Sequence, residues 1–261
     1  MSKFMFSILK RTDHVRGQAV PQGVRIYAIG DIHGQLSLLE QLHEKIRDDI
    51  KGKPNTCKSK IIYLGDYINR GAQSRGIIDR LIDNPIENTH ALYLMGNHEF
   101  ALIKFLSGNM SYAEWLGWGG DQTLLSYEID VISPYADEEE IEALRKEFRS
   151  RIPARHYHFL STLQPYQVEG DYLFVHAGIR PGIPLHEQKL QDLILIRDEF
   201  LRNPVTCGKT VIHGHTVFKT PHIRKNRRRI DSIGIDTGAY NTGKLTAIVL
   251  ENEEYHFLTA Q

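Results

Sequence analysis

Aspartate, asparagine and histidine side chains stand beside glycine at five places along the chain, each time just after a short apolar run. The five places hold Asp31 and His33, Asp66, Asn97 and His98, His176, and His215. Glycine permits the tight turns that let a short side chain approach a ligand. One such residue alone is typical of an ordinary hydrogen-bonded loop, but five sets together predict one shared site. Carboxylate, carboxamide and imidazole groups without cysteine form a ligand set for Mn²⁺, Fe or Zn²⁺.

The first three sets each follow a predicted strand and precede a predicted helix. These strands lie at residues 24–30, 61–64 and 91–95, and they are rich in β-branched and aromatic residues. In an open α/β sheet, ligands bind beyond the carboxyl ends of the strands. The side chains that follow these strands are therefore expected to meet at one edge of a sheet.

Residues 107–164 break this rhythm and have helical spacing, with Trp115, Trp118 and a Gly-Gly pair. A helical insertion with its own core is the favoured interpretation, and a wall that faces the substrate is the alternative. Strands dominate after Gln164. We therefore predict an α/β fold (α+β by some schemes), in which two sheets pack face to face and helices lie outside. One domain would span residues 23–261, preceded by a flexible N-terminal arm at residues 1–22.

Composition narrows the class of protein. The chain has 261 residues, of which 41% are hydrophobic and 25% charged, as in soluble globular proteins. Lysine plus arginine equals aspartate plus glutamate at 32 each, so the chain has no global basic field and nucleic acid is not an expected partner. The basic run at residues 222–229 is interpreted as a solvated loop or hairpin, with a rim that attracts anions or contacts nucleic acid as the alternative.

Two sequence features bear on location. Cys57 and Cys207 are far apart and form neither a disulfide framework nor a CxxC zinc pattern, which fits a reducing cytoplasm. The apolar piece at residues 4–9 is too short to span a membrane, so no membrane partner is expected. The sequence leaves the oligomeric state open.

The motifs resemble those of the phosphoprotein phosphatase group of metallophosphoesterases. GDxHG occurs at residues 30–34, GDxVDRG at 65–71 with Asn69 in place of its second aspartate, GNHE at 96–99, HAG at 176–178 and GHT at 214–216, in the family order. The Trp-Gly-Gly-Asp-Gln-Thr-Leu segment at 118–124 is similar to that of small bacterial and bacteriophage lambda type serine/threonine protein phosphatases. This resemblance implies the calcineurin-like metallophosphoesterase fold.

The resemblance also implies a dinuclear metal centre, with Mn²⁺ as the expected ion and Fe or Zn²⁺ as alternatives. Asp31 and His33 would bind the first ion, Asp66 would bridge, and Asn97, His176 and His215 would hold the second. Arg70, Arg197 and Asn97 would bind the substrate phosphate. Arg197 could instead pair with Asp198 or Glu199.

The mechanism implied by the resemblance is in-line attack on phosphorus by a hydroxide that bridges the metals, with His98 as the general acid. In the family an aspartate hydrogen-bonds this histidine, but here the residue is Asn69. An amide oxygen could accept from a ring nitrogen of His98, yet it brings no negative charge. We therefore hypothesise that the enzyme is slower on alkyl phosphates than on aryl phosphates or phosphoanhydrides, whose leaving groups need little protonation.

Three functions are compatible with the sequence. The leading interpretation is a serine/threonine protein phosphatase, acting on a phosphoprotein or on a phosphorylated small molecule. The alternative is hydrolysis of dinucleoside polyphosphates, because symmetrical diadenosine tetraphosphate hydrolases share these motifs. The third is a catalytically impaired phosphate-binding module that has kept its metals.

Overall fold

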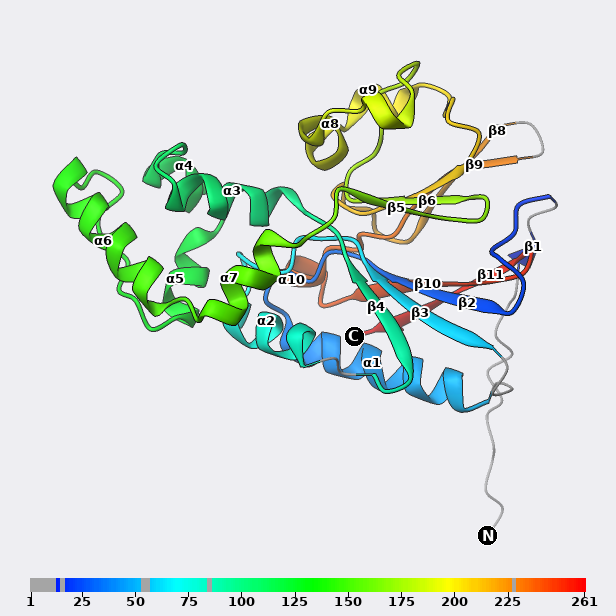
Figure 1. The fold of residues 1–261 in the computed structure, drawn as a ribbon, viewed down its shortest axis with the longest axis horizontal. Helices are drawn as coiled ribbons and strands as arrows, with labels where there is room; N and C mark the ends of the chain where they lie inside the picture. The colour runs from blue at the N-terminus through cyan, green and yellow to red at the C-terminus, as the bar shows by residue number, and fades with distance from the viewer. Residues whose placement is uncertain (1–12, 15–16, 53–56, 84–85, 227–228) are drawn as a thin grey trace, which may run out of the picture.

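Two β-sheets lie face to face, with helices on their outer faces (Figure 1). The computed structural model describes residues 13–14, 17–52, 57–83, 86–226 and 229–261. Alternate residues of the facing strands build the core between the sheets, including Ile26 and Ala28 from one sheet and Phe174 and Ile212 from the other. The predicted α/β arrangement of two packed sheets with outer helices is confirmed.

The first sheet has six strands in the order β1-β11-β10-β2-β3-β4. They are β1 (Asp13–His14), β2 (Val24–Ile29), β3 (Lys58–Tyr63), β4 (Thr89–Tyr93), β10 (Leu245–Glu251) and β11 (Glu254–Ala260). Strands β2, β3 and β4 are parallel, as expected for consecutive strand-loop-helix units. Strand β10 comes from the far end of the chain and pairs antiparallel with β2.

The second sheet has five strands in the order β5-β6-β7-β9-β8. They are β5 (Tyr166–Glu169), β6 (Tyr172–Val175), β7 (Thr210–His213), β8 (His222–Asn226) and β9 (Arg229–Gly234). Strands β6, β7 and β9 are parallel, so their carboxyl ends lie at one edge. The basic run at 222–229 belongs to the antiparallel pair β8 and β9, and residues 227–228 lie outside the described part. Arg224 of this run donates to the carbonyls of Phe200 and Leu201, which is a structural role.

Helices cover the outer face of each sheet. Beneath the first sheet lie α1 (Leu36–Lys51) and α2 (Ser74–Ile82), and above the second lie α8 (Leu190–Leu195) and α9 (Asp198–Arg202) (Figure 1). Helix α1 buries Leu39, Leu42 and Ile46, which recur at the spacing of one helical face. The short elements η1 (Leu185–Glu187) and α10 (Ala239–Thr242) lie in connections.

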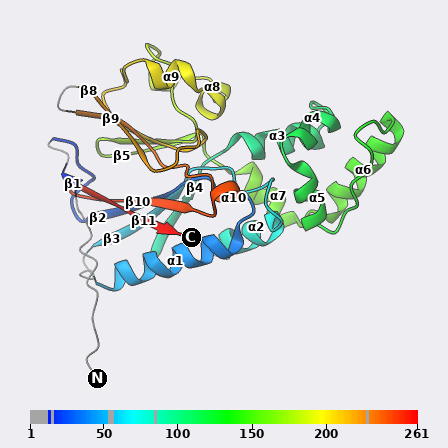
Figure 2. The ribbon, with the colours of Figure 1, turned by 180° about the vertical axis from the view of Figure 1, so that it is seen from behind.

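Five further helices form a lobe at one side of the sheets (Figure 2). They are α3 (Asn97–Leu106), α4 (Tyr112–Gly117), α5 (Gly120–Ser126), α6 (Glu138–Arg151) and α7 (Ala154–Ser161). Four of them lie within residues 107–164. Trp115 is buried and stacks on Phe105, with ring centroids 4.4 Å apart. Both rings belong to the same hydrophobic cluster as Leu39 and Ile78 of α1 and α2, so the core of the lobe is continuous with the core beneath the first sheet. None of the described helices is long and apolar enough to cross a membrane.

The segment before β2 is partly described. Residues 1–12 and 15–16 of the predicted flexible arm lie outside the described residues. Residues 17–22 belong to the packed structure, because the buried Gln18 side chain donates to the carbonyl of Ile230 and the Val20 N–H donates to that of Asn252. Packed structure therefore begins before residue 23, where the domain was expected to start.

Candidate metal and phosphate site

The carboxyl ends of strands from both sheets meet at one site. Asp31, Asp66 and Asn97 follow β2, β3 and β4 of the first sheet, whereas His176 and His215 follow β6 and β7 of the second. All five side chains are buried. The structure thus brings together residues that are up to 184 positions apart, as the backbone N–H of His215 donates to the Asp31 carboxylate at 3.1 Å.

Asp66 stands at the centre of the site. Its Oδ2 lies 3.5 Å from the Nε2 atoms of both His33 and His176, and 3.8 Å from Nε2 of His98. Two groups of possible ligand atoms share Asp66: one with His33 and His98, the other with His176 and His215, and within each group the atoms lie within 4.8 Å of one another. A carboxylate shared by two such groups has the placement that a bridging ligand needs.

Asn97 and Asp31 complete the predicted ligand set in different ways. The Oδ1 atom of Asn97 lies 2.9 Å from Nε2 of His176, inside the cluster. Asp31 belongs to neither group of close ligand atoms among the described residues. Burial raises the pKa of the Asp31 carboxyl well above its usual value, and the nearby carboxylates of Asp236 and Asp66 raise it further. Three carboxyl groups therefore crowd together at this point, and their charged forms are disfavoured unless a cation offsets them.

Asp236 is a site residue that the sequence interpretation missed. It is buried, it lies just beyond β9, and its pKa is raised by burial. Its signal in the sequence is the same as that of the chosen residues, since an apolar strand precedes it and Thr237-Gly238 follows.

The charge states of the site suit a cation. Burial lowers the pKa of His33 to about 3, of His176 to about 4 and of His215 to about 2, so these imidazoles are neutral at pH 7. Burial raises the pKa of Asp66 to about 7. In the described structure, Nε2 of His215 is buried without a hydrogen-bond partner. A neutral imidazole with an unpartnered nitrogen beside crowded carboxyl groups fits a divalent metal ion, which the donor types also favour.

The turn after β3 has an unusual backbone. Asp66, Asn69 and Arg70 have φ angles of 53°, 67° and 67°, in the left-handed region that residues other than glycine rarely adopt. His33 and His215 share this feature, with φ angles of 46° and 61°. Such strain persists only where the surrounding structure enforces it, and it concentrates at functional sites.

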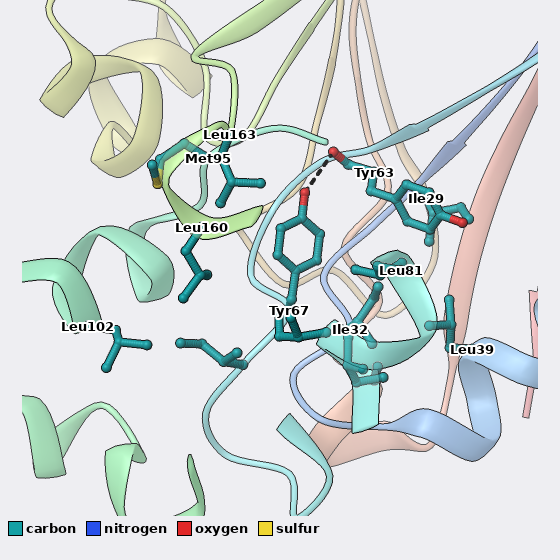
Figure 3. Packing of buried hydrophobic residues seen from close by; sticks show 14 of the residues in the cluster. Ile29, Ile32, Leu39, Tyr63, Tyr67, Leu81, Met95, Leu102, Leu160 and Leu163 are labelled. Atoms are coloured by element: carbon teal, nitrogen blue, oxygen red, sulfur yellow. Dashed lines mark hydrogen bonds between the residues drawn. The ribbon is translucent and has the colours of Figure 1, made fainter. Parts of the chain in front are cut away.

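Two buried side chains hold this turn in place. The Glu99 carboxylate accepts hydrogen bonds from the backbone N–H groups of Asp66, Tyr67 and Ile68 at 2.8–3.2 Å. The Tyr67 ring points into the core, where its hydroxyl donates to the carbonyl of Tyr63 at 3.3 Å (Figure 3). The same hydroxyl donates to the carbonyl of Leu94 at 2.7 Å. The strained turn is therefore fixed from both sides.

Both predicted phosphate arginines lie near the cluster. Arg70 Nη1 is 3.0 Å from Nε2 of His33, and its guanidinium stacks on the ring of Tyr240, with Cζ 4.6 Å from the centroid. The charge of Arg197 contributes to lowering the pKa of His176, His215 and Asp66.

The alternative partners of Arg197 are engaged elsewhere. Asp198 pairs with Arg202 at 2.8 Å, and Glu199 pairs with Arg180 at 2.7 Å. The exposed side chain of Arg197 thus lies close enough to influence the cluster, while neither acid beside it in sequence is bonded to it in these pairs.

The contact between Asn69 and His98 differs from the expectation. The amide nitrogen Nδ2 of Asn69, not its oxygen, lies 3.0 Å from Nδ1 of His98, while Oδ1 accepts from the Thr123 hydroxyl at 2.6 Å. Thr123 comes from α5 of the helical lobe. The sequence did not predict that this residue contacts Asn69. Trp118 also reaches the site, with its ring centroid 5.5 Å from that of His98. The helical lobe therefore borders the site.

Comparisons with known proteins agree on a family. Residues 24–242 match the family described as calcineurin-like phosphoesterase. A protein named bis(5'-nucleosyl)-tetraphosphatase PrpE, designated asymmetrical, from Bacillus cereus is 30% identical over 239 residues, which cover 84% of this chain and 88% of the relative. A protein of the same name from Anoxybacillus flavithermus is 27% identical with the same coverage.

Solved structures show the same fold. A protein provisionally described as a diadenosine tetraphosphatase has a TM-score of 0.56 at 19% identity, covering 91% of this chain and 94% of that one. A protein serine/threonine phosphatase from Saccharomyces cerevisiae has a TM-score of 0.54 at 15% identity, covering 92% and 81%. The sequence relatives above carry the names of dinucleoside tetraphosphatases, not of the lambda type protein phosphatases to which the motifs were compared.

Proposed function

The chain belongs to the calcineurin-like phosphoesterase family, and from that premise we propose that it is a metal-dependent hydrolase of dinucleoside polyphosphates. The observation that carries the proposal is the buried Asp66 carboxylate, shared by two histidine groups and lying beside Arg70. This arrangement offers a cation site and a phosphate site next to each other. The substrate class is supported by relatives at 27% and 30% identity named bis(5'-nucleosyl)-tetraphosphatases.

Tyr240 supports a nucleotide over a phosphoprotein. Its ring is 40% exposed although it lies against Arg70, a predicted phosphate-binding residue. Aromatic rings bind nucleobases by stacking, which contributes about 1–3 kcal/mol per base. A dinucleotide held by Arg70 at its phosphates would have a base within reach of such a ring. The serine/threonine protein phosphatase that the motifs first suggested becomes the second candidate.

The predicted ligands Asp31, His33, Asp66, Asn97, His176 and His215 would hold divalent metal ions, for which we propose Mn²⁺, with Fe or Zn²⁺ as alternatives. Bound there, such ions supply Lewis acidity that polarises phosphoryl oxygens and activates water. Arg70 and Arg197 bind and orient the phosphate, since a planar guanidinium matches two phosphate oxygens. His98 presents a ring nitrogen to the leaving oxygen, and Asn69 holds that ring.

The Asn69 contact favours a phosphoanhydride. Because Nδ2 of Asn69 faces His98, no carboxylate is present to stabilise a charged imidazolium. The leaving group of a dinucleoside polyphosphate is itself a nucleotide phosphate, which departs as an anion without being protonated. A serine alkoxide needs that proton. The site is therefore better matched to anhydride cleavage.

Turnover of diadenosine tetraphosphate and of a phosphoserine peptide, each measured with Mn²⁺, Zn²⁺ or Fe²⁺, tests the proposal. We expect the dinucleotide to be cleaved with the higher kcat/KM. Chromatography of the products separates two ADP molecules, from symmetrical cleavage, from ATP plus AMP. A higher kcat/KM on the peptide would establish the protein phosphatase instead. Metal and phosphate binding without turnover of either substrate would establish the impaired binding module.

A further inference from the structure

We propose that Thr123 is a positioning residue that orients the Asn69 amide and thereby holds His98 as the tautomer with its proton on Nε2. Thr123 lies on α5, within the helical lobe, and touches none of the predicted metal ligands in its hydrogen bonds. It would act on the reaction only through Asn69. The inference deepens the proposed function, on which it rests for the role of His98.

Three buried polar side chains form the relay behind His98. The Thr123 hydroxyl lies 2.6 Å from Asn69 Oδ1 and 3.0 Å from the Ser74 hydroxyl. The Asn69 backbone N–H donates to both hydroxyl oxygens, at 3.0 Å to Thr123 and 3.1 Å to Ser74. All three residues have no exposed surface, so their protons must be shared among the groups present.

Counting protons fixes the orientation of the amide. Because the Asn69 N–H points at both hydroxyl oxygens, each hydroxyl proton must find another acceptor. The Ser74 proton goes to Thr123 and the Thr123 proton goes to Asn69 Oδ1, so both hydroxyl protons have an acceptor. With the amide reversed, Thr123 would donate to Ser74, and the Ser74 proton would have no acceptor among the hydrogen bonds of the described residues. A buried donor without an acceptor costs about 1–3 kcal/mol, which disfavours the reversed amide.

The orientation of the amide decides where the His98 ring carries its proton. With Oδ1 engaged by Thr123, the NH₂ group of Asn69 donates to Nδ1 of His98, 3.0 Å away. Nδ1 therefore accepts, and the proton of the neutral ring sits on Nε2. That nitrogen lies 3.8 Å from Asp66 Oδ2, on the side of the predicted ligands. His98 is thus held ready to donate a hydrogen bond into the site.

The chain offers a matched pair of variants. Thr123→Val keeps the shape of the side chain and removes the donor to Asn69, so the amide becomes free to turn. Ser74→Ala also removes a buried hydroxyl from the relay, but it leaves Thr123 with Asn69 as its acceptor. Each variant loses one hydroxyl, but the proposal expects only Thr123→Val to change the His98 tautomer. Thr123→Ser keeps a hydroxyl donor and is expected to keep the wild-type tautomer.

The tautomer can be read directly by long-range ¹H–¹⁵N NMR of histidine rings in the full chain, with and without Zn²⁺. His98→Gln assigns the signal. We expect Nε2–H in the wild type, Ser74→Ala and Thr123→Ser, and a shift towards Nδ1–H in Thr123→Val. In kinetics with phenyl phosphate, whose leaving group needs a proton, Thr123→Val should lower kcat about tenfold and leave KM unchanged, whereas kcat for diadenosine tetraphosphate should change little.

Two outcomes would overturn the inference: an unchanged His98 tautomer in Thr123→Val, or the same tautomer shift in Ser74→Ala. Thr123→Ala serves as the second variant if Thr123→Val does not fold. The NMR measurement needs no substrate. A chain that fails to cleave the dinucleotide but shows the expected tautomers would therefore contradict the proposed function and leave the relay intact.

Discussion

At the scale of single residues, the proposed treatment of a phosphate depends on a few side chains. Asn69 donates to His98 where the motif resemblance implies an aspartate that accepts, and Thr123 accounts for that orientation in the proposed relay. Tyr240 adds an exposed aromatic surface beside Arg70. The charge beside His98, the proton position on its ring and the aromatic surface beside Arg70 would thus each depend on one residue. Each can be changed by a single substitution.

Replacing Asn69 with aspartate should supply the missing negative charge. The carboxylate would accept from Nδ1–H of His98 and stabilise its protonated form, so general acid assistance should increase. We expect kcat/KM to rise about tenfold on phenyl phosphate and to change little on nitrophenyl phosphate, whose leaving group needs no proton. If both substrates respond equally, the hypothesis on Asn69 is wrong.

Truncating Tyr240 should weaken binding of a nucleotide selectively. Tyr240→Ala is expected to raise KM for diadenosine tetraphosphate about tenfold, in line with the loss of one stacked base. Phenyl phosphate serves as the reference substrate, because it lacks a base, and Tyr240→Phe is the control that keeps the ring. An equal loss on both substrates would show that Tyr240 only supports Arg70.

Residue types at the ends of strands were readable from the sequence because glycine and polar residues interrupt apolar runs there. The predicted residues around Asp66 do gather in one buried cluster. The orientation of the Asn69 amide was not readable, since it depends on Thr123, 54 positions away. Asp236 was overlooked although its pattern was the same.

Strand ends and the turns after them provide the scaffold of the site. The turn after β3 holds three residues with positive φ, and Glu99 at the start of α3 fixes that turn through backbone hydrogen bonds. The strands were recognisable by their composition. The bonds from Glu99 were not, because they join two consecutive units of the chain through space.

Replacing Glu99 with glutamine should loosen this turn. One carboxylate oxygen of Glu99 accepts from the backbone N–H groups of Tyr67 and Ile68, and the other accepts from those of Asp66 and Gly96. Whichever oxygen the NH₂ group of glutamine replaces, two of these hydrogen bonds are lost. We expect the free energy of unfolding to fall by about 2–5 kcal/mol in urea titrations. The exposed Glu114→Gln is the matched control and should change it by less than about 0.5 kcal/mol. A small change in the unfolding free energy of Glu99→Gln would mean that the turn keeps its conformation without these hydrogen bonds.

Acid should loosen the contact between α1 and the first sheet. His43 of α1 is buried against the Tyr63 hydroxyl, and burial lowers its pKa from 6.5 to about 3. The unfolded chain therefore binds a proton that the folded chain does not, and stability falls as the pH drops below 6.5. For this one group the loss is about 2 kcal/mol between pH 7 and pH 5.

The measurement is urea unfolding of the metal-free protein at several pH values. His43→Gln should show a shallower dependence of the unfolding free energy on pH than the wild type. The exposed His186→Gln should keep the wild-type slope. Identical slopes for all three proteins would rule out His43 as a contributor.

At the level of the whole molecule, the site joins the two sheets. Asp31 and Asp66 come from one sheet and His176 and His215 from the other, so bound metal ions would link both. The sequence predicted two packed sheets from the change from alternating elements to strands. It did not predict that β10 lies between β11 and β2, because pairing across such distances leaves no local pattern.

Removing metal ions should therefore destabilise the entire domain. At ion concentrations about a hundredfold above Kd, binding contributes about 2.7 kcal/mol. We expect EDTA to lower Tm by about 5–10 °C, as measured by calorimetry. His215→Ala should lower Tm in the presence of metal and reduce the effect of EDTA, whereas His186→Ala should do neither. An unchanged Tm on chelation would indicate that no ion links the sheets.

The position of β10 has a consequence for synthesis on the ribosome. Strand β2 is made long before its antiparallel neighbour, residues 245–251. Before β10 is made, the edge of β2 that pairs with β10 in the folded protein is open. An open strand edge is a template for aggregation. Chains that terminate before residue 245 would keep this edge open permanently, and we therefore expect such chains to be insoluble even though they contain all the predicted metal ligands.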